Sequence, residues 1–75
     1  MGEEKILFTA RLEISKDKRS FYFEDIRTRS GDVVAKYLIP KLNINDRDSL
    51  MNLEKGCFLV FLANVDFKDV EIIWN

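Results

Sequence analysis

The strongest constraint on the fold is a ten-residue stretch near the N-terminus in which apolar and polar side chains alternate. The apolar side chains stand at every second position: Ile6, Phe8, Ala10, Leu12 and Ile14. Successive side chains of a β-strand point to opposite faces of a sheet, whereas a helix repeats about every 3.6 residues. Residues 6–15 are therefore predicted to form a strand with one buried face.

Two further strands follow, each bounded by polar residues. Residues 16–19 contain no apolar side chain and predict a hairpin loop. The run from Phe21 to Ile26 predicts a second strand, because aromatic residues are enriched in strands. Ser30-Gly31-Asp32 supplies turn residues, and residues 33–39 predict a third strand. Pro40 ends that strand, since proline cannot donate to a β-ladder.

The segment after Pro40 has the residues of a short helix. Several polar side chains can cap its N-terminus: Asn43, Asn45, Asp46, Asp48 and Ser49. Gly56 stands where a glycine commonly follows the last helical turn. The sequence therefore predicts a helix of two or three turns that presents Leu50 and Leu53 to the core.

Two strands are predicted after the helix. Residues 57–63 are uniformly apolar, too few for a long helix, and bounded by Gly56 and Asn64, which favours a strand buried on both sides. Residues 66–69 predict a turn, and residues 70–74 a final strand.

Three strands, one helix and two strands make a mainly β chain. Short connections favour antiparallel pairing, since parallel strands need long crossovers. Closing the sheet into a barrel would remove its exposed edges. Residues 1–75 are predicted to be one domain, a small five-stranded antiparallel barrel with one short helix between the third and fourth strands.

The residue pattern from the second strand to the fourth is similar to that of a known group of domains. Phe21-Tyr22-Phe23-Glu24-Asp25-Ile26, the turn Ser30-Gly31-Asp32 and Val33-Val34-Ala35 match its second and third strands. Leu53-Glu54-Lys55-Gly56 matches its leucine-x-x-glycine entry into strand four. The pattern resembles the nucleic-acid-binding OB-fold domains, including anticodon-binding domains of aminoacyl-tRNA synthetases and the replication protein A group. The family often has glycine where this chain has Ala10 and Ala63.

The sequence lacks the residue combinations of common active sites. It has no histidine and one cysteine, Cys57, which excludes Ser-His and Cys-His arrangements and the usual zinc sites. Its three glycines do not form a phosphate-binding loop. Glu24 and Asp25 would share a site only if a β-bulge intervened. We therefore expect a protein that is not an enzyme and uses no metal or cofactor.

Charge and cysteine content bear on location and partners. The net charge of −1 and the pI near 5.3 are unlike those of a polybasic nucleic-acid binder. No apolar run is long enough to span a membrane, and residues 1–5 do not resemble a signal peptide. With no intrachain disulfide available, we expect a soluble cytoplasmic protein without a membrane partner.

The resemblance implies that single-stranded nucleic acid crosses the second and third strands. If Phe21 and Phe23 face the core, Tyr22 points outward, where a base can stack on it. Tyr37 is a further aromatic candidate, and cations nearby would meet phosphates. The predicted nucleic-acid-binding residues are Arg11, Lys16, Lys18, Arg19, Tyr22, Arg27, Arg29 and Lys36. We expect weak binding of DNA or RNA with little base specificity.

A protein-interaction or assembly role is the alternative. A small barrel cannot bury both faces of the fourth predicted strand unless another element covers one of them. The exposed apolar face would then bind a second copy of the chain or another protein. The predicted interface residues are Phe58, Val60, Leu62 and Trp74.

Overall fold

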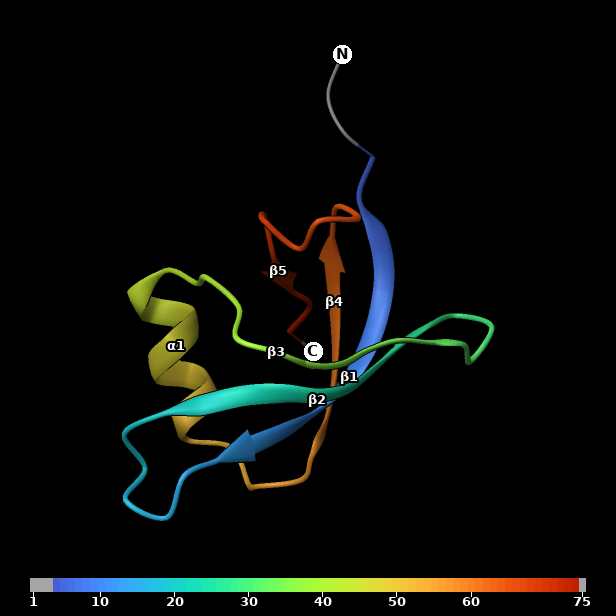
Figure 1. Ribbon diagram of the computed structural model, residues 1–75. Coiled ribbons are helices and arrows are strands. Elements are labelled where there is room, and N and C mark those ends of the chain that lie inside the picture. Colours follow the sequence, from blue (N-terminus) through green and yellow to red (C-terminus); the bar gives the residue numbers. More distant parts are fainter. Residues whose placement is uncertain (1–3, 75) are drawn as a thin grey trace.

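The computed structural model describes residues 4–74, which form one curved sheet with a short helix beside it (Figure 1). The expectation for the N-terminus falls largely on residues 1–3, which lie outside this range. The strands are β1 (Ile6–Ile14), β2 (Phe21–Thr28), β3 (Val33–Leu38), β4 (Phe58–Ala63) and β5 (Glu71–Ile72). The helix α1 (Ile44–Met51) lies between β3 and β4 in the chain.

The five strands pair antiparallel in the order β3-β2-β1-β4-β5. The predicted five antiparallel strands and short helix are thus confirmed. The sheet is open in the part of the chain described, because no pairing joins its two edge strands, β3 and β5.

Strand β1 lies at the centre of the sheet and pairs on both sides. Its residues from Phe8 to Ile14 pair with β2, and those from Ile6 to Arg11 pair with β4. Phe8, Ala10 and Leu12 are buried, as the alternation predicts. β1 is strongly curved, so that β2 and β4 run in different directions on its two sides (Figure 1).

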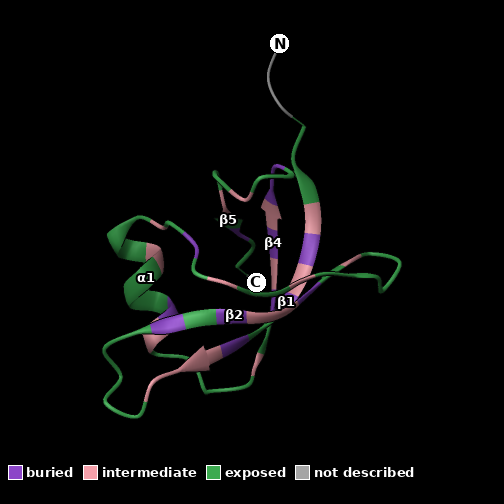
Figure 2. Ribbon diagram, in the orientation of Figure 1, coloured by how far each residue is buried: buried purple, intermediate pink, exposed green. Residues whose placement is uncertain are grey.

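The core lies on the concave side of this sheet. Phe23 of β2 and Phe61 of β4 are fully buried, with ring centroids 5.3 Å apart. Leu50 of α1 is buried in the same cluster, while the rest of the helix is largely exposed (Figure 2). Burying side chains of this size stabilises a fold by roughly 1.5–3 kcal/mol each, so these contacts dominate the stability of a small domain.

A β-bulge interrupts β2 at Asp25. Asp25 has a positive φ of 58°, and two residues of β2, Asp25 and Ile26, stand opposite Ala10 of β1. Aspartate tolerates this left-handed conformation better than most residues. Beyond the bulge Ile26 points inward again and is buried, so the hydrophobic face of β2 is preserved.

The helix begins as predicted and ends earlier than predicted. Asn43 is the N-cap, and its side chain accepts a hydrogen bond from the Asp46 amide at 2.8 Å. The chain leaves the helix after Met51, with Asn52 as C-cap. Two predictions are therefore wrong: Leu53 is exposed beyond the helix, and Gly56 (φ 85°) turns the chain into β4 rather than following the last helical turn.

The last two strands also differ from expectation. β4 is buried on one face only, because Leu59 and Phe61 face the core while Phe58 is 78% exposed. β5 has two residues instead of the predicted five, although the Ile73 amide still donates to the Val60 carbonyl at 2.9 Å.

Replacing Phe61 with alanine is expected to remove about 3–5 kcal/mol from the free energy of unfolding, because it leaves a cavity in the core. This is a large part of the roughly 5–15 kcal/mol typical of a whole domain. Phe58→Ala, on the exposed face of the same strand, should cost less than about 1 kcal/mol. Guanidinium denaturation, followed by the fluorescence of Trp74, measures the free energy of unfolding of both variants. Equal losses would contradict this assignment of the two faces.

Candidate nucleic-acid interface

The convex face of the sheet carries four of the eight predicted binding residues: Arg11, Tyr22, Arg27 and Lys36. A row of directly opposed residues crosses four strands: Tyr37, Glu24, Arg11 and Phe58. Opposed residues of a sheet share one face. The exposed Tyr37 and Phe58 therefore lie at the two ends of a row whose centre is charged.

Two tyrosines form the aromatic part of this face. Tyr22 points outward between the buried Phe21 and Phe23, so its predicted orientation is confirmed. Its ring lies edge-on to that of Tyr37, with centroids 6.1 Å apart and planes at 79°. Tyr37 is the more accessible of the two, at 67% against 38%.

The tyrosines border a hollow of about 370 Å³, here called the aromatic hollow. It is lined by Tyr22, Glu24, Lys36, Tyr37 and Ile39. A second depression of about 390 Å³, here called the charged hollow, adjoins it. This one is lined by Arg11, Glu24, Asp25, Val33 and Lys36. Glu24 and Lys36 therefore form the boundary between the two hollows.

Two of the predicted arginines form ion pairs with carboxylates. Arg11 Nη2 donates to Glu24 Oε2 at 3.1 Å, and Arg27 Nε donates to Asp25 Oδ2 at 3.2 Å. Arg27 also donates to the Gly31 carbonyl at 2.9 Å. Exposed pairs of this kind contribute roughly 0–1 kcal/mol, which a phosphate can compete with. Within residues 4–74, no ion pair holds Arg29 or Lys36.

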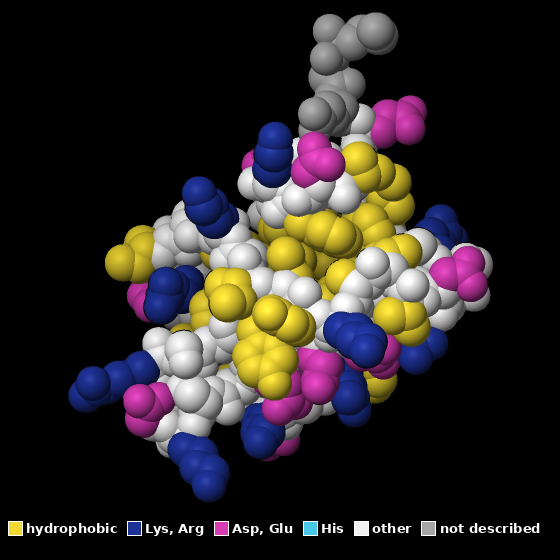
Figure 3. All heavy atoms as spheres, viewed as in Figure 1, with side chains coloured by type: hydrophobic (Ala, Val, Ile, Leu, Met, Phe, Trp, Pro, Cys, Tyr) yellow, Lys and Arg dark blue, Asp and Glu magenta, His cyan; other side chains and the backbone are white. Residues whose placement is uncertain are grey.

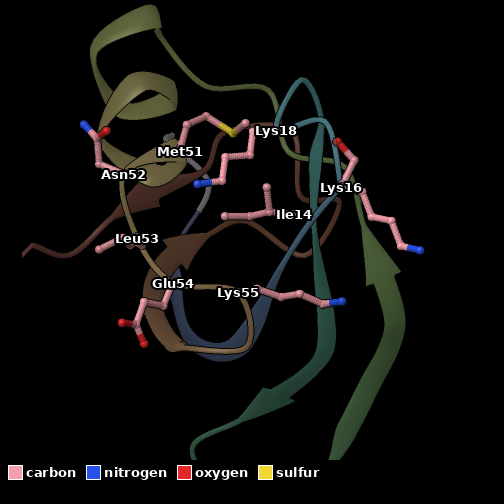
Figure 4. A pocket seen from close by; sticks show the side chains of 9 residues that line it. Ile14, Lys16, Lys18, Met51, Asn52, Leu53, Glu54 and Lys55 are labelled. Atoms are coloured by element: carbon pink, nitrogen blue, oxygen red, sulfur yellow. The ribbon is translucent and has the colours of Figure 1, made fainter.

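The β1–β2 loop carries Lys16, Lys18 and Arg19. It borders a groove of about 510 Å³ against the segment after α1, lined by Ile14, Ser15, Lys16, Lys18, Met51, Asn52, Leu53, Glu54 and Lys55. Figure 4 shows Lys18 extending across this groove toward Met51, whereas Lys16 points away from it. The groove shares no lining residue with the aromatic hollow, so Lys18 lies at a different part of the surface from the tyrosines.

Hydrogen bonds fix the conformation of this loop. Asp17 Oδ1 accepts from the Ser15 hydroxyl and from the Arg19 amide. The Ser15 hydrogen bond, followed by that of Arg19, lowers the pKa of the Asp17 carboxyl below its ordinary value. The loop thus presents its cations on an ordered turn.

Two further hollows with mainly apolar linings lie near Ile39 and Phe67, and the sequence analysis did not predict them. Ile39 also lines a hollow of about 440 Å³ with Lys41, Phe67 and Lys68. Phe67 in turn lines a further hollow of about 240 Å³, together with Ile6, Phe8, Thr28, Val34 and Val65. In the view of Figure 3, hydrophobic side chains gather over the middle of the molecule, with both basic and acidic side chains at the margins. The sequence feature that could have indicated these hollows is Phe67, an aromatic residue within a charged turn.

The predicted interface residues divide into two groups. Phe58, Val60 and Leu62 share the convex face of β4, where Phe58 is exposed and the other two are half-buried. Trp74 is held against the helix, because its indole Nε1 donates to Asp46 Oδ1 at 3.0 Å.

Clustered metal ligands and thiol side chains are sparse in the part of the chain described. No group of three or more His, Cys, Asp or Glu residues there could hold a metal ion. Burial raises the pKa of the Cys57 thiol, which lowers its reactivity as a nucleophile.

Comparisons of the chain with known protein families, with curated proteins and with solved structures find no match. Among residues 4–74, no helix is both long and apolar enough to cross a membrane.

Ser15→Ala is expected to raise the pKa of Asp17 toward its ordinary value, because it removes the hydrogen bond that lowers it most. At pH values above the ordinary carboxyl pKa, the hydrogen bonds to the ionised Asp17 stabilise the native state. This contribution is lost as the pH falls through the lowered pKa of Asp17. Carboxyl-carbon NMR titration measures the shift, with Ser49→Ala in α1 as the control. An unchanged Asp17 pKa in Ser15→Ala would refute the stated cause.

Proposed function

We propose that this chain is an OB-fold domain that binds single-stranded DNA or RNA, with little sequence specificity, on the convex face of β2 and β3. The observation that carries the proposal is the exposed Tyr37, packed edge-on against Tyr22 beside Lys36. Aromatic faces stack bases of any sequence, and a neighbouring cation meets the phosphate. No catalytic role and no cofactor belong to this proposal.

The element order and the shape of the sheet support the OB-fold assignment. A strongly curved β1 pairs with both β2 and β4, and α1 lies between β3 and β4 in the chain. An OB-fold is a partly open five-stranded barrel whose second and third strands bind oligonucleotides. We therefore propose that the sheet is a barrel of this partly open kind, in a cytoplasmic protein as the single cysteine suggests.

The net charge of −1 is compatible with this role because local charge decides phosphate binding. Screening at physiological salt limits the reach of an exposed charge to about 8 Å. Lys36 lies in both hollows, and Lys41 and Lys68 border the apolar surface next to Ile39. A strand crossing the tyrosines would therefore meet cations along its path, although the protein as a whole is acidic.

Tyr37→Ala is expected to weaken binding of a fluorescein-labelled ten-thymidine strand about 5- to 100-fold, the range for losing one stacked base. Fluorescence anisotropy at low salt measures the affinity. Phe58→Ala removes another exposed aromatic ring, at the other end of the row, and should bind like the parent protein. Failure of the parent protein to bind at low salt would refute the proposal.

The salt dependence gives an independent check on the phosphate contacts. Affinity should fall as salt is raised, with a slope of about 0.7 per phosphate neutralised. Lys36→Ala should reduce the number of neutralised phosphates by about one. Lys5→Ala is the control, because Lys5 is paired with Glu71 at 3.3 Å, outside both hollows.

A protein-interaction role is the second candidate, and the exposure of Phe58 favours it. Phe58 is 78% exposed on the same face as Val60 and Leu62, which are only half-buried. Large exposed apolar side chains on one face are typical of protein interfaces.

Phe58→Glu tests this second role. If two copies associate through β4, light scattering should give a dimer mass for the parent protein and a monomer mass for Phe58→Glu, because the carboxylate would be buried at the interface. A monomeric parent protein at high concentration would argue against self-association.

A further inference from the structure

A carboxylate lies at the centre of the proposed binding face, where a polyanion would be expected to avoid it. Glu24 is directly opposite Tyr37, two residues from Tyr22 on the same strand, and lines both hollows. Its side chain is 35% exposed. A surface that only neutralised phosphates would have no use for an acidic group at this position.

The structure fixes this carboxylate and leaves part of it available. Arg11 Nη2 donates to Glu24 Oε2 at 3.1 Å, which orients the group and neutralises its charge. Among residues 4–74, no other side-chain hydrogen bond reaches the Glu24 carboxylate. Each carboxylate oxygen can accept two hydrogen bonds, so Glu24 retains acceptor capacity toward the aromatic hollow.

Building on the proposed function, we infer that Glu24 reads the Watson–Crick edge of one stacked base and favours guanine. An ionised carboxylate only accepts hydrogen bonds. Guanine presents two adjacent donors on this edge, N1–H and an N2 amino hydrogen, which match the two carboxylate oxygens. Unstacked bases are commonly read on this edge by proteins that bind single strands.

The other bases fit the same carboxylate less well. Adenine and cytosine present one amino group next to a ring nitrogen that is itself an acceptor. Thymine and uracil present a single N3–H between two carbonyl oxygens, which repel the carboxylate. With the base stacked on Tyr37, Lys36 is placed to meet its phosphate. Selectivity is thus confined to one nucleotide, and the rest of the strand is held without regard to sequence.

The test compares four ten-nucleotide thymidine strands whose central base is guanine, adenine, cytosine or thymine. The parent protein should bind the guanine strand about five- to tenfold more tightly than the all-thymine strand, a modest value for a bidentate contact that is partly exposed. Glu24→Gln should abolish this preference, because an amide replaces one acceptor with a donor. It should still bind the all-thymine strand, which also shows that the variant is folded.

Glu71→Gln is the matched control, since it removes the same charge from a β5 residue paired with Lys5 and outside both hollows. It should keep the guanine preference. Equal binding of all four strands by the parent protein, or an unchanged preference in Glu24→Gln, would overturn the inference while leaving the proposed function intact. Failure to bind any strand would overturn both.

Discussion

The two-sided pairing of β1 is the constraint on which the rest of the structure depends. Its inward side chains Phe8, Ala10 and Leu12 are buried between β2 and β4, so both neighbouring strands are positioned by one register. A shift of one residue would turn every buried side chain of β1 to solvent. Because the core of so short a chain is small, the stability of the fold depends strongly on this register.

The bulge in β2 opposite Ala10 links this register to the candidate site. The extra residue of β2 is accommodated at Asp25 and increases the local twist, where Ala10 needs little space. It also brings Glu24 and Asp25 to the border of one hollow, where they pair with Arg11 and Arg27. The same irregularity that bends the sheet thus sets the charge pattern of the convex face.

Much of the fold could be predicted because alternation and turn residues are local signals. The inward face of β1 and the outward position of Tyr22 follow directly from period two. The end of the helix could not be predicted in this way. Glycine often follows the last helical turn, but Gly56 adopts its positive φ in a later turn, just before β4. The bulge at Asp25 left a weak local signal: aspartate is uncommon in strands and tolerates a positive φ, but neither preference fixes the position of a bulge.

The candidate site was less predictable than the fold for a related reason. Sequence identifies cations, but whether a cation is available depends on its neighbours across the sheet. Arg11 and Arg27 looked equivalent to Lys36, yet of these three only the two arginines form ion pairs with the carboxylates that the register and the bulge bring close. Likewise Ile39 is 71% exposed because it extends beyond the last paired residue of an edge strand.

An acidic binder of nucleic acid is physically reasonable if affinity and selectivity come from different residues. In the proposed complex, stacking on Tyr37 and contacts from Lys36 would depend little on base identity and would act over a few ångströms. A carboxylate in that position lowers the overall affinity through repulsion of phosphate, unless a cation neutralises it. Arg11 supplies that cation at 3.1 Å. The ion pair therefore lets an acidic group remain at the centre of the face, where the proposed role of Glu24 is to distinguish bases by their hydrogen-bond donors.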